Sequence, residues 1–424
     1  MRLLLLGNGA REHALAWALN KSPFVDELHC MPGNGGIGQI AEIHEGNPED
    51  VKTVCRICEY IAADMVIVGP EAPLVAGIAD ALAERGIPAF GPRAAGAKLE
   101  GSKAFAKEFM ARHNIPTADF DICRTMKDAK QALAKRHAPY IVKANGLAAG
   151  KGVFVLKTRE EALDVSRQML EENLLQEAGR TLVIEDHLPG KELTVLVITD
   201  GITWKILPPS QDHKRVFDGD QGPNTGGMGA FCPVPWITED FLANIEAKVV
   251  SLTIRGLASE GVPFTGVLYC GLMLGDDGTF KVLEYNVRLG DPETQVVLPV
   301  FPGDFAEAAW AACHGDLASV SWKPTGDSAV GVVMASGGYP GHYEKGFEIT
   351  GLESLASAAR TFVFHAGTRK SGGRFMTNGG RVLTVVGTGG CIGEARKRAY
   401  DAVGKISFKH LHYRKDIAAF AQGE

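Results

Sequence analysis

Residues 143–156 read KANGLAAGKGVFVL, in which a lysine precedes glycine and alanine residues, a second lysine and an apolar tail. Glycine-rich turns beside a lysine commonly hold phosphate, because their backbone N–H groups form a cradle for an anion. The stretch does not fit the Walker pattern G-x-x-x-x-G-K-[ST]. Gly146 and Gly150 have only three residues between them, and Gly152 follows Lys151 where a hydroxyl residue is needed. We therefore predict a flexible β-hairpin loop that closes over phosphates, with an ordinary surface hairpin as the alternative.

A second polar stretch, EYNVRLGDPETQ, lies at residues 284–295. Glu284 and Asn286 are two positions apart on a predicted strand, so their side chains face the same side. A carboxylate and an amide oxygen suit Mg²⁺, which prefers hard oxygen ligands and also takes phosphates. Arg288 continues this face and is placed to neutralise a transferring phosphoryl group. The alternative is a solvated strand face with weak Glu–Arg pairing.

The chain around these stretches has 424 residues, which suggests about three domains. Strands are predicted at residues 3–6, 28–31, 65–68 and 89–90, alternating with helices at 12–19, 51–62 and 74–85. Such alternation predicts a parallel sheet covered on both faces, with ligands at the carboxyl ends of its strands. Further on, helices are predicted at 102–113, 160–176, 239–260, 304–314 and 393–407. Strands are predicted around the 143–156 loop, at 181–185 and 193–208, in a hairpin at 266–287 and in a last β-rich block.

The first turn, GNGAREH at residues 7–13, partly resembles a dinucleotide fingerprint. Glu12 occupies the third glycine position, which weakens the interpretation as a nicotinamide-binding oxidoreductase. We expect instead that the backbone of this turn and Arg11 bind an anion.

Two loops fit the remainder of a nucleotide site. The segment VIEDHLPGKE at 183–192 ends a strand, so its backbone is placed for adenine and Glu192 for a ribose hydroxyl. The loop at 208–229 concentrates Asp212, His213, Lys214 and Arg215 before a glycine-rich tract. Long loops of this kind are usually functional lids or disordered, and its position favours a lid.

Composition narrows the class of protein. Hydrophobic residues make up 45% of the chain and the net charge is −6, which favours packed domains and argues against nucleic acid as the main partner. The eight cysteines lack a metal-binding pattern, and the close pair Cys55 and Cys58 is predicted on a buried helix face. No signal peptide or membrane-spanning segment is predicted. We expect a cytoplasmic protein without membrane partners, as a monomer.

The stretches KANGLAAGKGV and LEYNVRLGDPETQ together resemble the ATP-grasp enzymes. The runs GNGAREHALAW, VGPEAPL, LEGSKAF, SQDHKR, GPNTGGMGA, RLGDPETQ, FHAGT and TNGGRVL closely resemble the glycinamide ribonucleotide synthetase family, from residue 1 to about 416. The resemblance implies an α/β and α+β multidomain fold. Its units would be an N-terminal α/β domain at 1–102, an ATP-grasp domain at 103–326 with a mobile lid at about 120–190, and a C-terminal β-rich domain at 327–424.

The resemblance also implies a reaction, the ATP-dependent ligation of glycine to 5-phosphoribosylamine through a glycyl phosphate in purine biosynthesis. ATP and Mg²⁺ or Mn²⁺ would be required. The implied ATP contacts are Lys103, Lys143, Gly146, Gly150, Lys151 and Gly152 for the phosphates, and Glu185, Leu188 and Glu192 for adenosine. Glu284 and Asn286 would hold the metal. Arg288, Asp212 and Lys214 are expected to act in catalysis, and Asn8, Gly9, Arg11, Glu71, Asp291, Glu293 and Thr294 to bind substrates.

Within these stretches Asn145 stands where the family often has Asp, and His187 lies in the adenosine segment. Two other classes of function stay open at this point. Another ATP-grasp ligase or carboxylase of the purine pathway would share the loop and Glu284. A nucleotide-binding regulator without turnover would bind ATP but would have no need of the metal pair.

Overall fold

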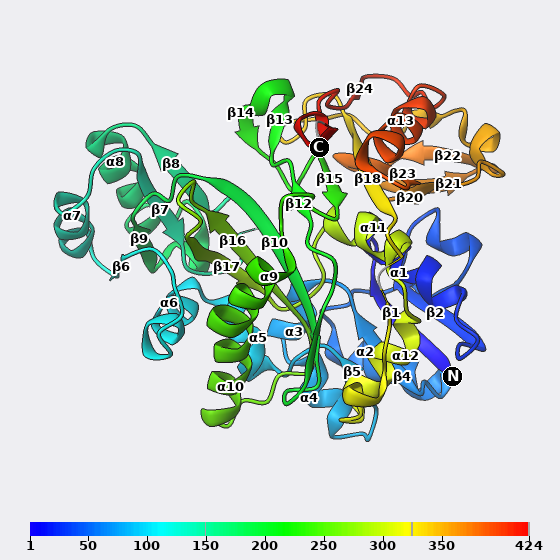
Figure 1. Cartoon of the computed structure of the whole chain (residues 1–424), viewed down its shortest axis with the longest axis horizontal. Coiled ribbons are helices and arrows are strands. Elements are labelled where there is room, and N and C mark those ends of the chain that lie inside the picture. Colours follow the sequence, from blue (N-terminus) through cyan, green and yellow to red (C-terminus); the bar gives the residue numbers. More distant parts are fainter. Residues whose placement is uncertain (149, 324, 423–424) are drawn as a thin grey trace.

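The computed structural model describes residues 1–148, 150–323 and 325–422. Ala149 of the glycine-rich loop and the last two residues of the predicted C-terminal unit lie outside the described residues. Figure 1 shows the N-terminal unit in blue at the lower right and the C-terminal unit in orange and red above it. The predicted lid, in cyan, lies on the far left, and a long central sheet in green lies between them.

The N-terminal sheet is fully parallel, as predicted, and has the strand order β3-β2-β1-β4-β5. Its strands are β1 (Arg2–Gly7), β2 (Glu27–Pro32), β3 (Glu42–Ile43), β4 (Met65–Val68) and β5 (Ala89–Phe90). Helices α1 (Ala10–Asn20) and α2 (Val51–Ile61) connect them, and Cys55 and Cys58 lie buried on α2 as predicted. The consecutive leucines of β1 are buried because helices cover both faces of a parallel sheet.

The prediction of one continuous helix at 74–85 is wrong. The chain forms α3 (Glu71–Val75) and α4 (Ile78–Ala83), separated at Gly77. Gly77 has a φ of 88°, a left-handed conformation that interrupts a helix and that glycine adopts without steric cost. A further helix, α5 (Ala94–Gly101), was not foreseen, and it leads directly into α6 (Lys103–Arg112).

The lid has its own hydrophobic core and an antiparallel sheet of order β6-β9-β7-β8. Its elements are β6 (Phe120–Cys123), α7 (Met126–Ala134), β7 (Tyr140–Ala144), β8 (Val153–Leu156), α8 (Arg159–Leu170), η2 (Gln176–Gly179) and β9 (Leu182–Glu185). The predicted hairpin is confirmed, since β7 and β8 pair with Lys143 opposite Val153. The helix predicted to residue 176 ends at Leu170.

The central sheet is antiparallel and faces the lid, with the order β11-β10-β16-β17. It consists of β10 (Lys191–Thr199), β11 (Trp204–Ile206), β16 (Gly266–Leu274) and β17 (Phe280–Asn286). The predicted helix at 239–260 forms as α9 (Glu239–Ile245), a π turn η4 (Glu246–Val250) and α10 (Ser251–Ser259), which share one core with the sheet. The predicted hairpin at 266–287 is confirmed by the pairing of β16 with β17.

The C-terminal unit is β-rich, as predicted. Its main sheet contains β12 (Gln211–Asp212), β15 (Gly229–Cys232), β18 (Ser328–Ser336), β23 (Arg381–Gly389), β20 (Thr361–His365) and β24 (Leu411–His412). A small sheet joins β19 (Glu348–Ile349), β22 (Arg374–Thr377) and β21 (Thr368–Ser371), and β13 (Arg215–Phe217) pairs with β14 (Gln221–Asn224). Helix α13 (Ile392–Val403) packs on β23 and ends before the predicted residue 407.

Strand β15 precedes residue 326 but pairs with β18 of the C-terminal unit, and β12 pairs in turn with β15. One sheet therefore crosses the predicted boundary between 326 and 327, and the three domain ranges stay a prediction. The chain between β17 and β18 forms α11 (Glu293–Val297), η5 (Leu298–Val300), α12 (Phe305–Cys313), close to the predicted 304–314, and η6 (Leu317–Ser319). Short 3-10 turns complete the fold: η1 (Ile37–Gln39), η3 (Asp218–Asp220), η7 (Leu352–Leu355) and η8 (Ala419–Gln422).

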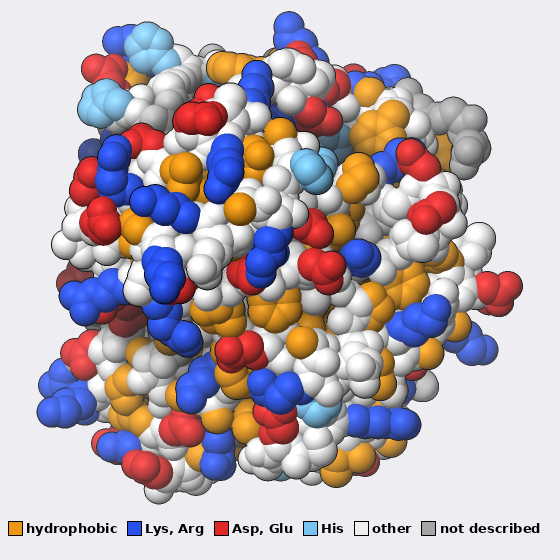
Figure 2. Space-filling view, turned by 90° about the vertical axis from the view of Figure 1, so that its left-hand side faces the viewer, with side chains coloured by type: hydrophobic (Ala, Val, Ile, Leu, Met, Phe, Trp, Pro, Cys, Tyr) orange, Lys and Arg blue, Asp and Glu red, His pale blue; other side chains and the backbone are white. Residues whose placement is uncertain are grey.

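Among the described residues, no single helix is both long and apolar enough to cross a membrane. One bent pair, Glu293–Val300 with Phe305–Cys313, meets the length and composition criteria jointly, with an angle of 105° between its halves. On the lid side of the molecule, Figure 2 shows Lys and Arg interspersed with Asp and Glu over the visible face.

Candidate active site

Two adjoining cavities lie between the lid, the central sheet and the N-terminal unit. The first has a volume of about 450 Å³ and the second about 610 Å³. Eight residues line both: Lys143, Gly150, Val153, Asp212, Lys214, Thr225, Leu283 and Glu284. The glycine-rich loop and the polar strand, predicted separately, therefore meet in one place.

Strand β17 carries the predicted metal pair at the edge of the central sheet. Glu284 and Asn286 both line the first cavity, as expected for alternate positions on a strand. Burial alone would raise the pKa of Glu284, but Lys214, Lys143 and Lys103 outweigh it and hold the pKa below its ordinary value. Glu284 is therefore ionised at neutral pH, and a carboxylate with an amide oxygen beside it is a donor set that fits Mg²⁺.

A cluster of lysines faces this pair. Lys143 on β7 and Lys107 on α6 contact the same buried carboxylate of Glu185, at 2.5 Å and 2.6 Å. Burial lowers the pKa of Lys107 to about 8, although Glu185 opposes the shift. The pKa of Lys103 is also lowered by burial, against the attraction of Glu284. Lys107 was missed from the sequence, although it lies one helical turn after Lys103 on the same face.

Asn145 ties the glycine-rich loop to the helix that carries these lysines. Its side-chain oxygen accepts hydrogen bonds from Ser102 Oγ at 2.9 Å and from the backbone N–H of Ala104 at 2.8 Å. The backbone N–H of Lys103 donates to the carbonyl oxygen of Asn145 at 2.9 Å. Asn145 thus caps the start of α6, a position where an oxygen acceptor is favoured.

The glycine-rich loop divides into two parts. Gly150 lines both cavities and Gly152 lines the first. Gly146 instead packs on η2, where an added Cβ would lie 2.9 Å from Ala178 Cα. The side chain of Lys151 is exposed and lines neither cavity. The structure therefore places Gly150 and Gly152, but not Gly146 or Lys151, at the cavity wall.

The second cavity contains all three residues predicted to contact adenosine. Leu188 and Glu192 line it beside His187, and apolar atoms come from Ile141, Val155 and Met273. Glu185 also lines it, but its carboxylate is held by Lys107 and Lys143. Charged side chains such as Lys191 and Asp186 line the rest of its wall, so the cavity offers a bound molecule both apolar and polar contacts.

Lys214 connects the two cavities. Its ammonium contacts Glu192 at 2.5 Å. Burial would lower the pKa of Lys214, but the nearby carboxylates of Glu192, Asp212 and Glu284 raise it well above its ordinary value. Burial raises the pKa of Asp212, and Glu293 and Glu192 add to the rise against the opposing charge of Lys214.

The substrate-binding residues predicted on RLGDPETQ have different environments. Glu293 is buried and accepts a hydrogen bond from the Tyr269 hydroxyl at 2.8 Å. Asp291 lines the first cavity and pairs with Arg381 of β23 at 2.9 Å. Thr294 is fully buried, with its hydroxyl donating to the carbonyl oxygen of Gly290, and it lines neither cavity. Arg381 was missed, although it belongs to the TNGGRVL run.

Arg288 is held by three side-chain acceptors, of which Glu100 is buried and Glu71 and Asn286 are partly buried. Its guanidinium donates to Glu100 at 2.7 Å, to Asn286 Oδ1 at 3.0 Å and to Glu71 at 3.2 Å. Burial would raise the pKa of Glu71, but Arg288 and Arg11 lower it below its ordinary value. Burial raises the pKa of Glu100 to about 7, against the pull of Arg288. Glu100 was missed from the sequence.

We expect the shifted Glu100 carboxyl to make stability fall as pH rises. In the unfolded chain it ionises near 4.5, whereas in the folded chain it stays protonated up to about 7. Between these values the unfolded state loses the proton first, so about 3 kcal/mol of unfolding free energy is lost by pH 7. The unfolding free energy of Glu100→Gln, measured with urea at pH 5 and pH 7.5, should lack this decline. The control Glu353→Gln, which changes an exposed carboxylate, should retain it. An equal decline in both variants would contradict the assignment.

The first turn is built differently from a dinucleotide site. Glu12 accepts a hydrogen bond from the backbone N–H of Gly9 at 2.6 Å and from Arg11 Nε at 2.6 Å. Its carboxylate therefore occupies the start of α1, where a pyrophosphate would otherwise bind. Arg11 lines the first cavity, whereas Asn8 and Gly9 do not. The side chain of Asn34 donates to the carbonyl oxygen of Asn8 at 2.9 Å.

Two antiparallel sheets that enclose a lysine-rich cavity, with an acidic strand at its edge, define an ATP-grasp protein. Models of the phosphoribosylglycinamide synthetase N domain, ATP-grasp (A) domain and C domain match residues 1–100, 101–294 and 329–420. The chain belongs to the phosphoribosylglycinamide synthetase family.

Relatives of the family span the whole chain. A phosphoribosylamine–glycine ligase of Vibrio cholerae is 44% identical, covering 98% of this chain and 97% of its own length. One of Streptomyces coelicolor is 45% identical over the full length of both. A crystal structure of this ligase from Thermotoga maritima has a TM-score of 0.87 and 38% identity, covering 99% of this chain and 100% of its own. A crystal structure of biotin carboxylase from Campylobacter jejuni shares the fold, with a TM-score of 0.75 at 13% identity. The match covers 97% of this chain and 92% of that one.

Proposed function

We propose that this chain is a phosphoribosylamine–glycine ligase, which joins glycine to 5-phosphoribosylamine and converts ATP to ADP and phosphate. The observation that carries the proposal is the shared wall of the two cavities. There Lys143, Lys214 and Glu284 come together from separate sheets and loops. One cavity is suited to adenosine and the other to phosphates and polar substrates.

The chemistry follows from the weakness of a carboxylate as an acyl donor. An oxygen of the glycine carboxylate attacks the γ-phosphorus, and the bond to the β-phosphate oxygen breaks to release ADP. The amine of phosphoribosylamine then attacks the carbonyl carbon of glycyl phosphate, and phosphate leaves with its bonding electrons while the amine loses a proton. Most of the catalysis is positioning and charge neutralisation, so we assign no general base.

We assign the charge neutralisation to four cations. Lys103 and Lys143 are placed to bind the ATP phosphates, while Lys214 and Arg288 face the other side of the same space. Gly150 and Gly152 bring backbone groups to the cavity, and the lid above them excludes water from the acyl phosphate. Leu188 and Glu192 form the adenosine end.

Glu284 and Asn286 are the residues that would hold Mg²⁺ or Mn²⁺. A bound divalent cation supplies neutralisation of phosphate charge. The carboxylates of Asp212, Asp291 and Glu293 are assigned to the two substrate amines. Asp291 is already paired with Arg381. A substrate amine at Asp291 therefore either displaces Arg381 or shares the carboxylate with it.

The partners in this proposal are small molecules, glycine and 5-phosphoribosylamine. We retain the monomeric state, the absence of nucleic-acid and membrane partners and the cytoplasmic location as predictions. Light scattering of the purified protein checks the first of these.

The deciding experiment measures ADP release with ATP, Mg²⁺ and glycine, with and without freshly made phosphoribosylamine. Release that needs both substrates and yields an equal amount of glycinamide ribonucleotide would establish the proposal. Release with bicarbonate or another carboxylate, but not with glycine, would retain the fold and reject the reaction. Binding of ATP without any release would favour a regulator.

For Arg11→Ala we expect the KM for phosphoribosylamine to rise on the order of 10- to 100-fold, with the dependence on Mg²⁺ unchanged. Arg11 lines the cavity and is ordered by Glu12 and by the carbonyl oxygen of Leu289, so it presents a fixed cation to the ribose phosphate. Steady-state kinetics with Arg374→Ala, an arginine in an exposed ion pair, provide the control. An unchanged KM would remove this role from Arg11.

A further inference from the structure

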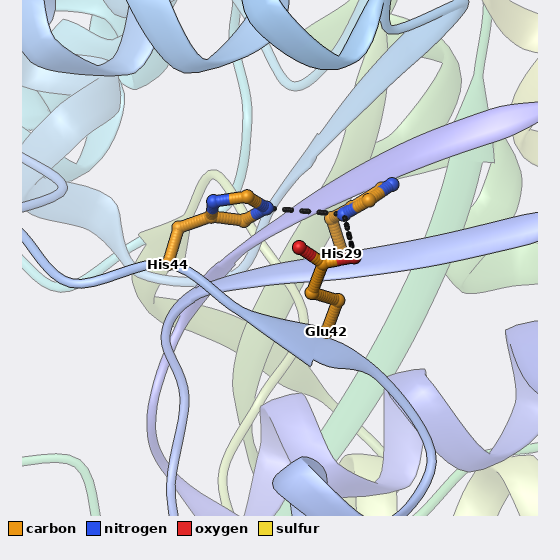
Figure 3. Close-up of side chains that lie close together, drawn as sticks. All are labelled: His29, Glu42 and His44. Carbon is orange, nitrogen blue, oxygen red and sulfur yellow. Dashed lines mark hydrogen bonds and ion pairs between the residues drawn. The ribbon is translucent and has the colours of Figure 1, made fainter.

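A second cluster of ligand-type side chains lies on the edge of the N-terminal sheet. Among the described residues, His29, Glu42 and His44 form a group whose ligand atoms all lie within 4.8 Å of one another. Figure 3 shows the two imidazoles and the carboxylate directed toward one another from β2, β3 and the residue after β3. None of the three lines either of the large cavities described above.

The backbone explains why these side chains meet. Strands β2 and β3 are parallel, with His29 opposite Glu42 in their register. Glu42 and His44 are two positions apart and so share a face with each other. The backbone N–H of His44 donates to the carbonyl oxygen of Cys30 at 2.9 Å, which extends the pairing beyond the end of β3. The cluster therefore rests on a regular sheet edge.

The spacing of the ligand atoms fits a tetrahedral ion. His29 Nδ1 lies 3.0 Å from His44 Nε2 and 3.6 Å from Glu42 Oε2. A tetrahedral ion with ligand bonds of about 2.0–2.1 Å holds its ligand atoms roughly 3.4 Å apart. These two separations lie on either side of that value, and the ligand atoms of Glu42 and His44 lie within 4.8 Å of each other, so side-chain movements alone can close the site.

The surroundings of His29 are also those of a metal-binding histidine. Its side chain is 6% exposed, and its Nε2 atom is buried without a hydrogen-bond partner among the described residues. The nearest carboxylate, Glu27 Oε2, lies 3.6 Å from it. A metal-binding histidine usually donates its other ring N–H to a carboxylate, which orients the ring. Glu27 is placed for that contact, on the same face of β2.

We propose that His29, Glu42 and His44 bind a zinc-class divalent transition-metal ion, with the fourth position open to water. Two imidazoles and one carboxylate are a ligand set typical of zinc, whereas Mg²⁺ takes oxygen ligands. The site is thus chemically distinct from the pair at Glu284 and Asn286. Binding would join β3 to β2, and ligand binding to the folded state stabilises it.

The site lies at the end of a segment that contacts both the N-terminal and the C-terminal unit. Between β2 and β3, Asn34 donates from its side chain to the carbonyl oxygens of Asn8 and His365. An ion held by Glu42 and His44 would fix the far end of this connection between the N-terminal and C-terminal units. Its effect is on stability, since the cluster is outside both cavities.

The test is a titration of the full-length protein with Zn²⁺ in excess Mg²⁺, followed by calorimetry, and with Co²⁺, followed by visible absorption. A Cys391→Ser background removes the exposed thiol from all samples. We expect one ion per chain, a four-coordinate Co²⁺ spectrum and an upward shift of Tm. His44→Ala should weaken binding on the order of 100-fold or more, and Glu27→Gln about 10-fold.

Two further variants distinguish the loss of a metal ligand from a loss of folding. Glu42→Gln changes an exposed ligand and should weaken binding without lowering the metal-free Tm. His137→Ala, an exposed histidine in the lid, should bind like the parent. Ligase activity with Mg²⁺ and ATP should be the same in His44→Ala. Equal Zn²⁺ affinity and an equal Co²⁺ spectrum in the parent and His44→Ala, or no binding in the parent, would overturn the proposal.

Discussion

Glu284→Gln should lower kcat/KM for ATP on the order of 100- to 1,000-fold and raise the Mg²⁺ concentration needed for half-maximal ADP release. The substitution keeps the shape of the side chain and removes one negative charge. That charge faces Lys214, Lys143 and Lys103, whose combined field lowers the pKa of Glu284 despite its burial. Without it, the three lysines repel both one another and an incoming divalent cation.

The control for this variant is Glu348→Gln, which removes a carboxylate from an exposed ion pair with Arg374. It should leave both the rate and the Mg²⁺ dependence unchanged. The Tm of Glu284→Gln should fall, because Lys214, Lys143 and Lys103 lose their shared counter-charge, so activity is compared well below the Tm of both proteins. Unchanged ADP release and Mg²⁺ dependence in Glu284→Gln would remove the metal pair from the proposal.

Arg288→Met should have the largest combined effect, with activity reduced about 100-fold or more and unfolding free energy lowered by about 3–5 kcal/mol. The guanidinium is shared by Glu100 and Glu71, and Glu100 is 8% exposed. Removing the arginine leaves the ionised carboxylate of Glu71 without the cation that does most to lower its pKa, and an unpaired buried charge is expensive.

A double-mutant cycle separates the two roles of Arg288. Glu100→Gln in the Arg288→Met background should recover part of the lost stability, because a neutral amide needs no counter-ion. It should not recover ADP release, since the cation that we assign to the phosphoryl group is still missing. Urea unfolding and ADP release are measured on all four proteins. Recovery of activity together with stability would mean that Arg288 acts only through the fold.

The parts of this protein that the sequence predicted depend on short-range geometry. The β7–β8 hairpin around the glycine-rich loop needs only neighbouring strands, and the common face of Glu284 and Asn286 needs only alternation. The parallel N-terminal sheet followed from the succession of strands and helices. The helix break at Gly77 was missed because apolar spacing continued across it, although glycine permits the left-handed turn there.

The tertiary structure alone decided which charged groups share a partner. Glu185, expected at adenosine, is held by Lys107 and Lys143, and Asp291 pairs with Arg381 from 90 residues further along the chain. The raised pKa of Glu100 requires burial beside Arg288, which no local pattern specifies. The cluster of His29, Glu42 and His44 likewise depends on the register of two strands. The sequence determines residue types and local periodicity, whereas burial and long-range pairing set the charge, and hence the chemistry, of each group.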